Sequence, residues 1–151
     1  MKGQHNNLDF LAATAAHQIC EVIDRKKVKA TDVEDLILKA LGVLQNHGVY
    51  AMALFLFSRS GRETETRKMS AEERIAVQIL ACLWPLHRPQ AVKVQNGKME
   101  LDKEPHQINP AKEEMLNAFR NLTQDLDTLL LVRDLYEQTL IYARYHARAL
   151  K

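Results

Sequence analysis

The chain has 151 residues, of which 46% are hydrophobic and 26% are charged, and its formal net charge is +2. This length supports one domain with a hydrophobic core, and the composition is that of a globular protein rather than a disordered or fibrous one. A charge so close to neutral gives no general affinity for nucleic acid, so any such affinity must come from how the charges are distributed.

Two helices are predicted first. Apolar residues recur every three or four positions from Leu8 to Val22, which is the spacing of one helical face. A second helix follows, because Thr31 and Glu34 form a capping-box pattern that favours a helix start. Gly48 is expected to end it, since glycine readily adopts the left-handed conformation found at helix ends.

The least polar stretch of the chain is GVYAMALFLF, which ends at Phe57. It is too short for a membrane span, which needs about 20 apolar residues. A strand is an alternative because Phe, Tyr and Val favour strands, but Ala, Met and Leu favour a helix. A helix that is apolar all round is expected to be buried all round. Val49–Phe57 is therefore predicted to be a central helix, in which Leu54→Ala should cost about 2–5 kcal/mol.

A helix and then a hairpin are predicted next. Ser70 and Glu73 form a second capping box, and their helix is expected to stop near Pro85. Beyond it lies VKVQNGKMEL, in which Asn96-Gly97 separates two short arms. This dipeptide between alternating arms is the strongest short-range signal for a β-hairpin.

Two more helices are predicted in the C-terminal part. Asn109-Pro110 opens one of them, with Asn as the cap and Pro in the first turn. The last runs from about Asp125 to the end. Residues 1–151 are thus predicted to form a single all-α domain, a compact helical bundle around a short central apolar helix, with a small β-hairpin insertion near 92–101. Cys20 and Cys82 lie in apolar helical patterns and are predicted to be buried free thiols.

The residues that carry catalysis in other proteins form no recognisable set. The six histidines make neither an HExxH pair nor a zinc-ligand spacing with cysteine. Asp32 and Asp35 have the ExxE-type spacing by which all-α nucleotide pyrophosphatases hold Mg²⁺, although acids are also favourable at any helix start. The sequence therefore favours a protein with no catalytic residues, metal or cofactor. A small metal-dependent nuclease or nucleotide pyrophosphatase is the alternative.

Basic residues gather in three clusters. The first lies between two predicted helices and comprises Arg59, Arg62, Arg67 and Lys68. The second occupies one stripe of the last helix and comprises Arg144, Arg148 and Lys151. The third follows the first helix and comprises Arg25, Lys26, Lys27 and Lys29. Cations are favourable at helix C-termini in any protein, but three clusters on a nearly neutral chain suggest a polarised surface suited to backbone phosphates.

Two stretches resemble a known family. Val43–Gly61, VLQNHGVYAMALFLFSRSG, places a glycine between one helix and an apolar helix rich in Ala, Leu and Phe. Leu129–Leu150, LLLVRDLYEQTLIYARYHARAL, has a tyrosine, then small and apolar positions, then a basic finish. In both respects the chain resembles the small helical subunit of type III-B CRISPR effector complexes, the Cmr small subunit.

The resemblance implies an all-α subunit of an antiviral effector complex that is not itself an enzyme. Such subunits stack on one another and on the subunits that grip the guide RNA, and they offer a basic surface to guide and target RNA. The first two clusters are then the RNA-binding residues. The N-terminal MKGQHNNLDF lacks the apolar segment of a signal peptide, so a cytoplasmic location away from membranes is expected. A helical protein-interaction module without nucleic acid is a third reading.

Overall fold

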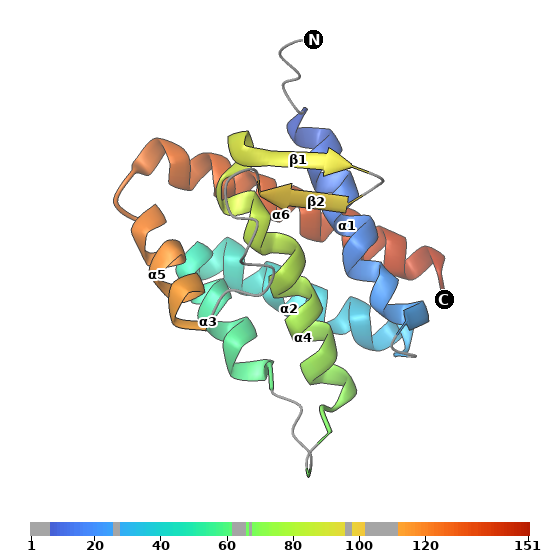
Figure 1. Cartoon of the computed structure of the whole chain (residues 1–151). Coiled ribbons are helices and arrows are strands. Elements are labelled where there is room, and N and C mark those ends of the chain that lie inside the picture. The colour runs from blue at the N-terminus through green and yellow to red at the C-terminus, as the bar shows by residue number, and fades with distance from the viewer. Residues whose placement is uncertain (1–6, 26–27, 62–65, 67, 96–97, 102–111) are drawn as a thin grey trace.

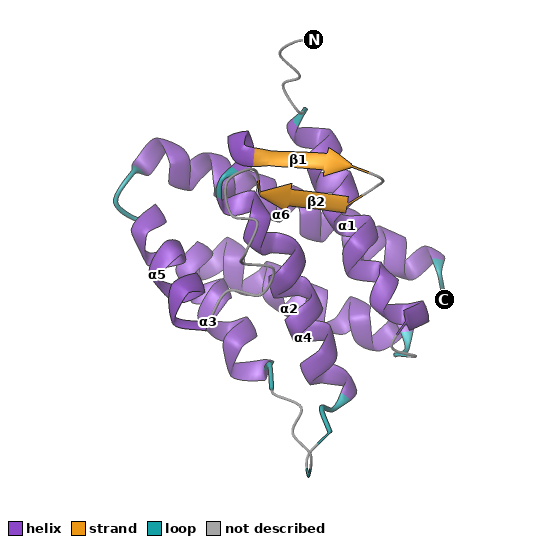
Figure 2. Cartoon of the chain, viewed as in Figure 1, coloured by secondary structure: helices purple, strands orange, loops and turns teal. Residues whose placement is uncertain are grey.

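The computed structural model describes residues 7–25, 28–61, 66, 68–95, 98–101 and 112–151. This part of the chain is mostly helical, which confirms the all-α prediction (Figures 1 and 2). Its α-helices are α1 Leu8–Arg25, α2 Ala30–His47, α3 Val49–Arg59, α4 Ala71–Leu83, α5 Lys112–Leu122 and α6 Leu126–Ala149. No helix in these described ranges is long and apolar enough to cross a membrane.

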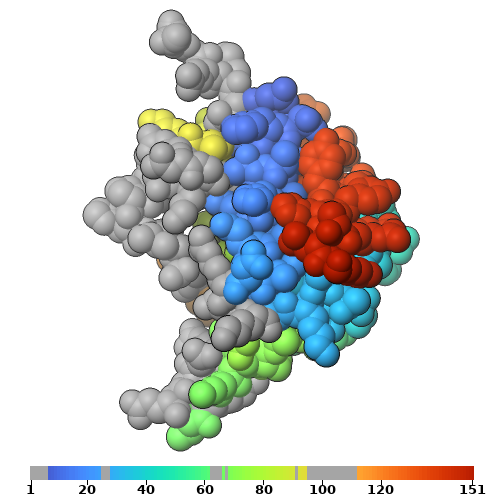
Figure 3. Space-filling model, turned by 90° about the vertical axis from the view of Figure 1, so that its right-hand side faces the viewer, coloured from blue at the N-terminus to red at the C-terminus, as the bar shows by residue number. Residues whose placement is uncertain are grey.

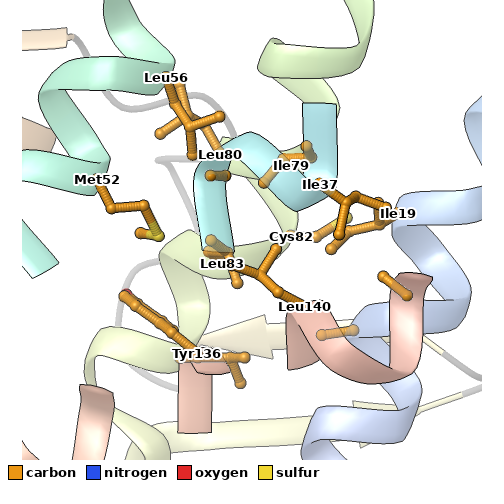
Figure 4. Close-up of a cluster of buried hydrophobic side chains, with 14 of the residues drawn as sticks. Ile19, Ile37, Met52, Leu56, Ile79, Leu80, Cys82, Leu83, Tyr136 and Leu140 are labelled. Atoms are coloured by element: carbon orange, nitrogen blue, oxygen red, sulfur yellow. The ribbon is translucent and has the colours of Figure 1, made fainter. Parts of the chain in front are cut away.

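One cluster of buried apolar side chains joins the helices. The long helix α6 packs along both α1 and α2, and α4 packs against α1, α2 and α3. Figure 4 shows side chains from α1, α2, α3, α4 and α6 converging on this interior. Cys20 and Cys82 belong to the cluster as free thiols, as predicted, and burial raises their pKa values to about 11 and about 12.

Two of the predicted helix boundaries are confirmed. The N–H of Glu73 donates to the Ser70 hydroxyl at 3.2 Å, and the Glu73 carboxylate accepts from the Ser70 N–H at 2.9 Å, which completes the capping box of α4. Gly48 has φ +92°, in the region that favours glycine. Its N–H donates to the carbonyl of Leu44 and its own carbonyl accepts from Met52, so one residue ends α2 and starts α3.

The capping box predicted for α2 is wrong. The helix begins at Ala30, after Lys29, and has no side-chain cap. Thr31 therefore already lies inside the first turn, and Glu34 lies two residues beyond the third helical position, from which a capping-box acid reaches back to the helix start. Its carboxylate is occupied elsewhere, by cations from the other end of the chain.

The prediction that α3 is buried on all sides is also wrong. α3 is a helix, and its main packing partners among the described elements are α2, α4 and α5, which cover one side of it. Leu56 is fully buried, whereas Leu54 is 44% exposed. Tyr50 and Phe55 are half-buried and pack against the edge of the core. The large cost expected for Leu54→Ala therefore does not apply.

Two strands lie where the sequence predicts a hairpin. After α4, two 3₁₀ turns at Trp84–His87 and Pro89–Ala91 lead into β1. β1 Val92–Gln95 pairs antiparallel with β2 Lys98–Leu101, with Val92 opposite Leu101. The predicted turn at Asn96-Gly97 and the predicted helix start at Asn109-Pro110 lie outside the described residues.

Candidate nucleic-acid interface

A buried carboxylate organises the basic end of α6. Glu34 lies in the second turn of α2 and is only 6% exposed. Lys151 Nζ lies 2.5 Å from Glu34 Oε1, and the Nε atoms of Arg148 and Arg144 lie 3.5 Å and 3.7 Å from Oε2. We refer to Arg144, Arg148 and Lys151, with Glu34 at their centre, as the C-terminal cluster.

Helix periodicity explains why these side chains meet. The spacing of i, i+4 and i+7 puts the three cations on one stripe of α6, and α6 packs along α2 beside a row of buried small residues that includes Ala143 and Ala147. The stripe borders the start of α2, where Glu34 lies. The cations are also favourable at this end of α6, because the carbonyl end of a helix carries partial negative charge.

The cluster carries more positive than negative charge. The hydrogen bond from Lys151 lowers the pKa of Glu34. Burial alone would raise this pKa, but the positive charges of Lys151, Arg148 and Arg144 lower it further, and the net shift is downward. Three cations around one carboxylate leave two positive charges in excess. The side chains of Arg144, Arg148 and Lys151 are 35%, 53% and 42% exposed. The buried Glu34 carboxylate thus holds the three cations in place, and their side chains remain accessible to solvent.

Glu34→Gln is expected to make stability less dependent on acid pH. Because its pKa is lowered in the folded state, Glu34 contributes stability above its usual pKa of 4.5, and this contribution is lost as pH falls through the lower folded value. Urea unfolding at pH 7 and at steps from pH 5 to pH 3 should show a smaller acid-induced loss in the variant than in wild type. Glu114→Gln, at an exposed position on α5, controls for removing one negative charge. Equal acid-induced losses in Glu34→Gln and wild type would contradict this role for Glu34.

The first predicted cluster is only partly described. Arg59, at the end of α3, pairs with Glu72 at 2.8 Å and stacks over the Phe55 ring at 5.0 Å. Lys68 is exposed, and Arg62 and Arg67 lie outside the described residues. In Figure 1 the end of α3 and the start of α4 lie at the bottom of the view, while the C-terminus lies at the right. The structure therefore does not join this cluster to the C-terminal cluster.

The third basic segment lies nearer to the C-terminal cluster. Lys29 is exposed immediately before α2, and Glu34 in the same helix contacts the end of α6. Figure 3 shows the last residues of α6 (red) on the surface beside residues of α1 and the start of α2 (blue). Lys26 and Lys27 lie outside the described residues, as does the side chain of Arg25.

The carboxylates that suggested metal chemistry lie at the start of α2. Asp32 and Asp35 are both exposed there. Within the described ranges, no three His, Cys, Asp or Glu side chains come close enough together to hold a metal ion.

Glu34 is the residue that sequence reasoning assigned wrongly. The Thr31–Glu34 pattern gives a capping explanation for an acid at this position, so the pattern does not predict that Glu34 is buried. A signal was nevertheless present, because Glu34 continues the apolar series of Ile37, Leu41 and Leu44 at helical spacing. An acid on a buried stripe requires a cationic partner, and the basic stripe of the last helix was the richest source of one.

Comparisons with known proteins leave the family open. A scan against protein-family models, a search of curated proteins and a search of solved structures each gave no match to this chain.

Proposed function

We propose that this protein is a non-catalytic small subunit of a type III-B CRISPR RNA-guided effector complex, acting in the cytoplasm in antiviral defence. It contributes a basic surface to guide and target RNA, and it stacks on neighbouring subunits and on copies of itself. The observation that carries the proposal is the C-terminal cluster, which holds Arg144, Arg148 and Lys151 together with an excess of positive charge at the surface.

The geometry of the cluster suits phosphate rather than base recognition. Arginine and lysine neutralise backbone phosphates without reading sequence, and a guide-binding complex must accept guides of any sequence. The buried Glu34 keeps three flexible cations on one short stretch of surface, which reduces the rotamer entropy that each would lose on binding. Lys29, exposed immediately before α2, is a further cation at the start of the helix that carries Glu34.

The outer side of α3 supports the scaffolding part of the proposal. Leu54 is exposed there, while Tyr50 and Phe55 are half-buried against the core. Contact with a neighbouring subunit in a filament would remove the exposed Leu54 side chain from water.

Reconstitution tests the proposal. The chain is expressed with the remaining subunits and the guide RNA of a type III-B complex from the same organism. We expect it to co-purify with them, and we expect the assembled complex to cleave target RNA equally well when this chain carries Asp32→Asn and Asp35→Asn.

Two results would contradict the proposal. One is failure of the chain to co-purify with the guide-bound subunits. The other is turnover of RNA or nucleotides by the purified chain alone with Mg²⁺, lost on Asp32→Asn or Asp35→Asn, which would establish the metal-dependent enzyme instead.

A further inference from the structure

Two imidazole rings face each other across the α1–α6 contact. The ring centroids of His17 and His146 lie 5.3 Å apart, and the ring planes are tilted by 35° rather than stacked. In the described part of the chain, neither ring makes a hydrogen bond, so their nitrogens are available to a ligand. His17 is exposed and His146 is half-buried, which leaves the pair open to solvent from one side.

The helices that carry the pair are fixed relative to each other. The Cys20 thiol of α1 donates to the carbonyl of Ala143 in α6 at 3.4 Å. The hydroxyl of Tyr142 in α6 donates to the carboxylate of Asp9 in α1. These contacts hold the backbones that carry His17 and His146, so the two rings do not need a large rearrangement to act together.

The separation of the rings fits a shared metal ion. A zinc–nitrogen bond of about 2.1 Å, added to roughly 1.1 Å from nitrogen to ring centre, places each ring centre about 3.2 Å from the ion. At a tetrahedral angle, two such ring centres stand about 5.2 Å apart. The observed separation is 5.3 Å. The site requires one nitrogen of each ring to point at the same position, and His17 is exposed and so has room to turn about its side-chain bonds.

We propose that His17 and His146 form a two-imidazole binding site for Zn²⁺ at the junction of α1 and α6. Neutral imidazole is a preferred ligand for this ion and for its late first-row neighbours. Two protein ligands leave the remaining positions to water, so the site is an open one of modest affinity and not a closed structural site of four ligands.

Calorimetric titration with Zn²⁺ alone tests the site on the reduced full-length chain. Wild type is compared with His17→Ala, with His146→Ala and with the control His47→Ala, which removes an exposed histidine at the end of α2. Loss of even an outer-shell partner of a metal ligand typically costs about 10–100-fold in affinity. We therefore expect at least a 10-fold loss in His17→Ala and in His146→Ala, and less than a 2-fold change in His47→Ala. Unchanged affinity in His17→Ala would overturn the proposal.

A second measurement separates this site from adventitious binding elsewhere on the chain. An ion that bridges two helices binds only the folded state and therefore raises the thermal midpoint. Zn²⁺ should raise the midpoint of wild type and of His47→Ala, but not that of His17→Ala, whose helical circular dichroism should match wild type because the replaced side chain is exposed. A midpoint shift that persists in His17→Ala would place the ion elsewhere.

Discussion

Leu56→Ala is expected to lower the free energy of unfolding by about 2–5 kcal/mol, whereas Leu54→Ala, on the same helix, is expected to cost less than about 1 kcal/mol. Leu56 is fully buried and Leu54 is 44% exposed. Truncating Leu56 removes apolar contacts and leaves a cavity among side chains of α3 and α4 (Figure 4). At Leu54 the lost side chain already meets water, and no cavity forms.

Urea unfolding measures both variants, and each serves as the control for the other because residue type, helix and helix propensity are the same. The midpoint of Leu56→Ala should fall well below that of Leu54→Ala at an unchanged slope. Equal losses of 2 kcal/mol or more would show that both sides of α3 are buried, as the sequence alone suggested.

Reversal of the C-terminal cluster is expected to weaken RNA binding by on the order of 10–100-fold at about 50 mM salt, since two phosphate contacts are lost. The variant is Arg148→Glu with Lys151→Glu. The matched control is Lys39→Glu with Arg120→Glu, at exposed positions of α2 and α5, which changes the net charge by the same amount. The loss should be the same for RNAs of different sequence, because phosphates carry no sequence information.

This measurement needs high protein concentration or the assembled complex. A single chain offers few contacts, whereas stacked copies present theirs at high effective concentration. Equal weakening by the variant and its control would mean that the effect reflects net charge alone, and that the C-terminal cluster is not a binding surface.

The fold could be predicted where local chemistry decides the structure. The Ser70–Glu73 box and Gly48 mark their helix ends through hydrogen bonds and backbone conformation that depend on neighbouring residues only. The coverage of α3 could not be predicted in this way. Composition shows that its whole circumference is apolar, but the side that is buried depends on where α2, α4 and α5 pack.

In the candidate site, too, local spacing could be predicted from the sequence and tertiary contacts could not. Helical spacing alone predicts that Arg144, Arg148 and Lys151 share one stripe, and the structure confirms that they come together. The contact between that stripe and Glu34, more than a hundred residues earlier in the sequence, is a tertiary feature that no local pattern specifies. The same is true of His17 and His146, which lie on the first and last helices.

The dependence of RNA affinity on salt tests the central claim most directly, because Glu34→Gln and the cation reversals should change it in opposite directions. For single-stranded RNA the slope of log K against log salt is about −0.7 for each phosphate contact. Arg148→Glu with Lys151→Glu should flatten the slope by about 1.4, whereas Glu34→Gln, which frees a cation for phosphate, should steepen it by about 0.7. If the two variants merely unfolded, the slope of log K against log salt would become flatter in both of them. Slopes for both variants that equal the wild-type slope would contradict the assignment of the C-terminal cluster to RNA.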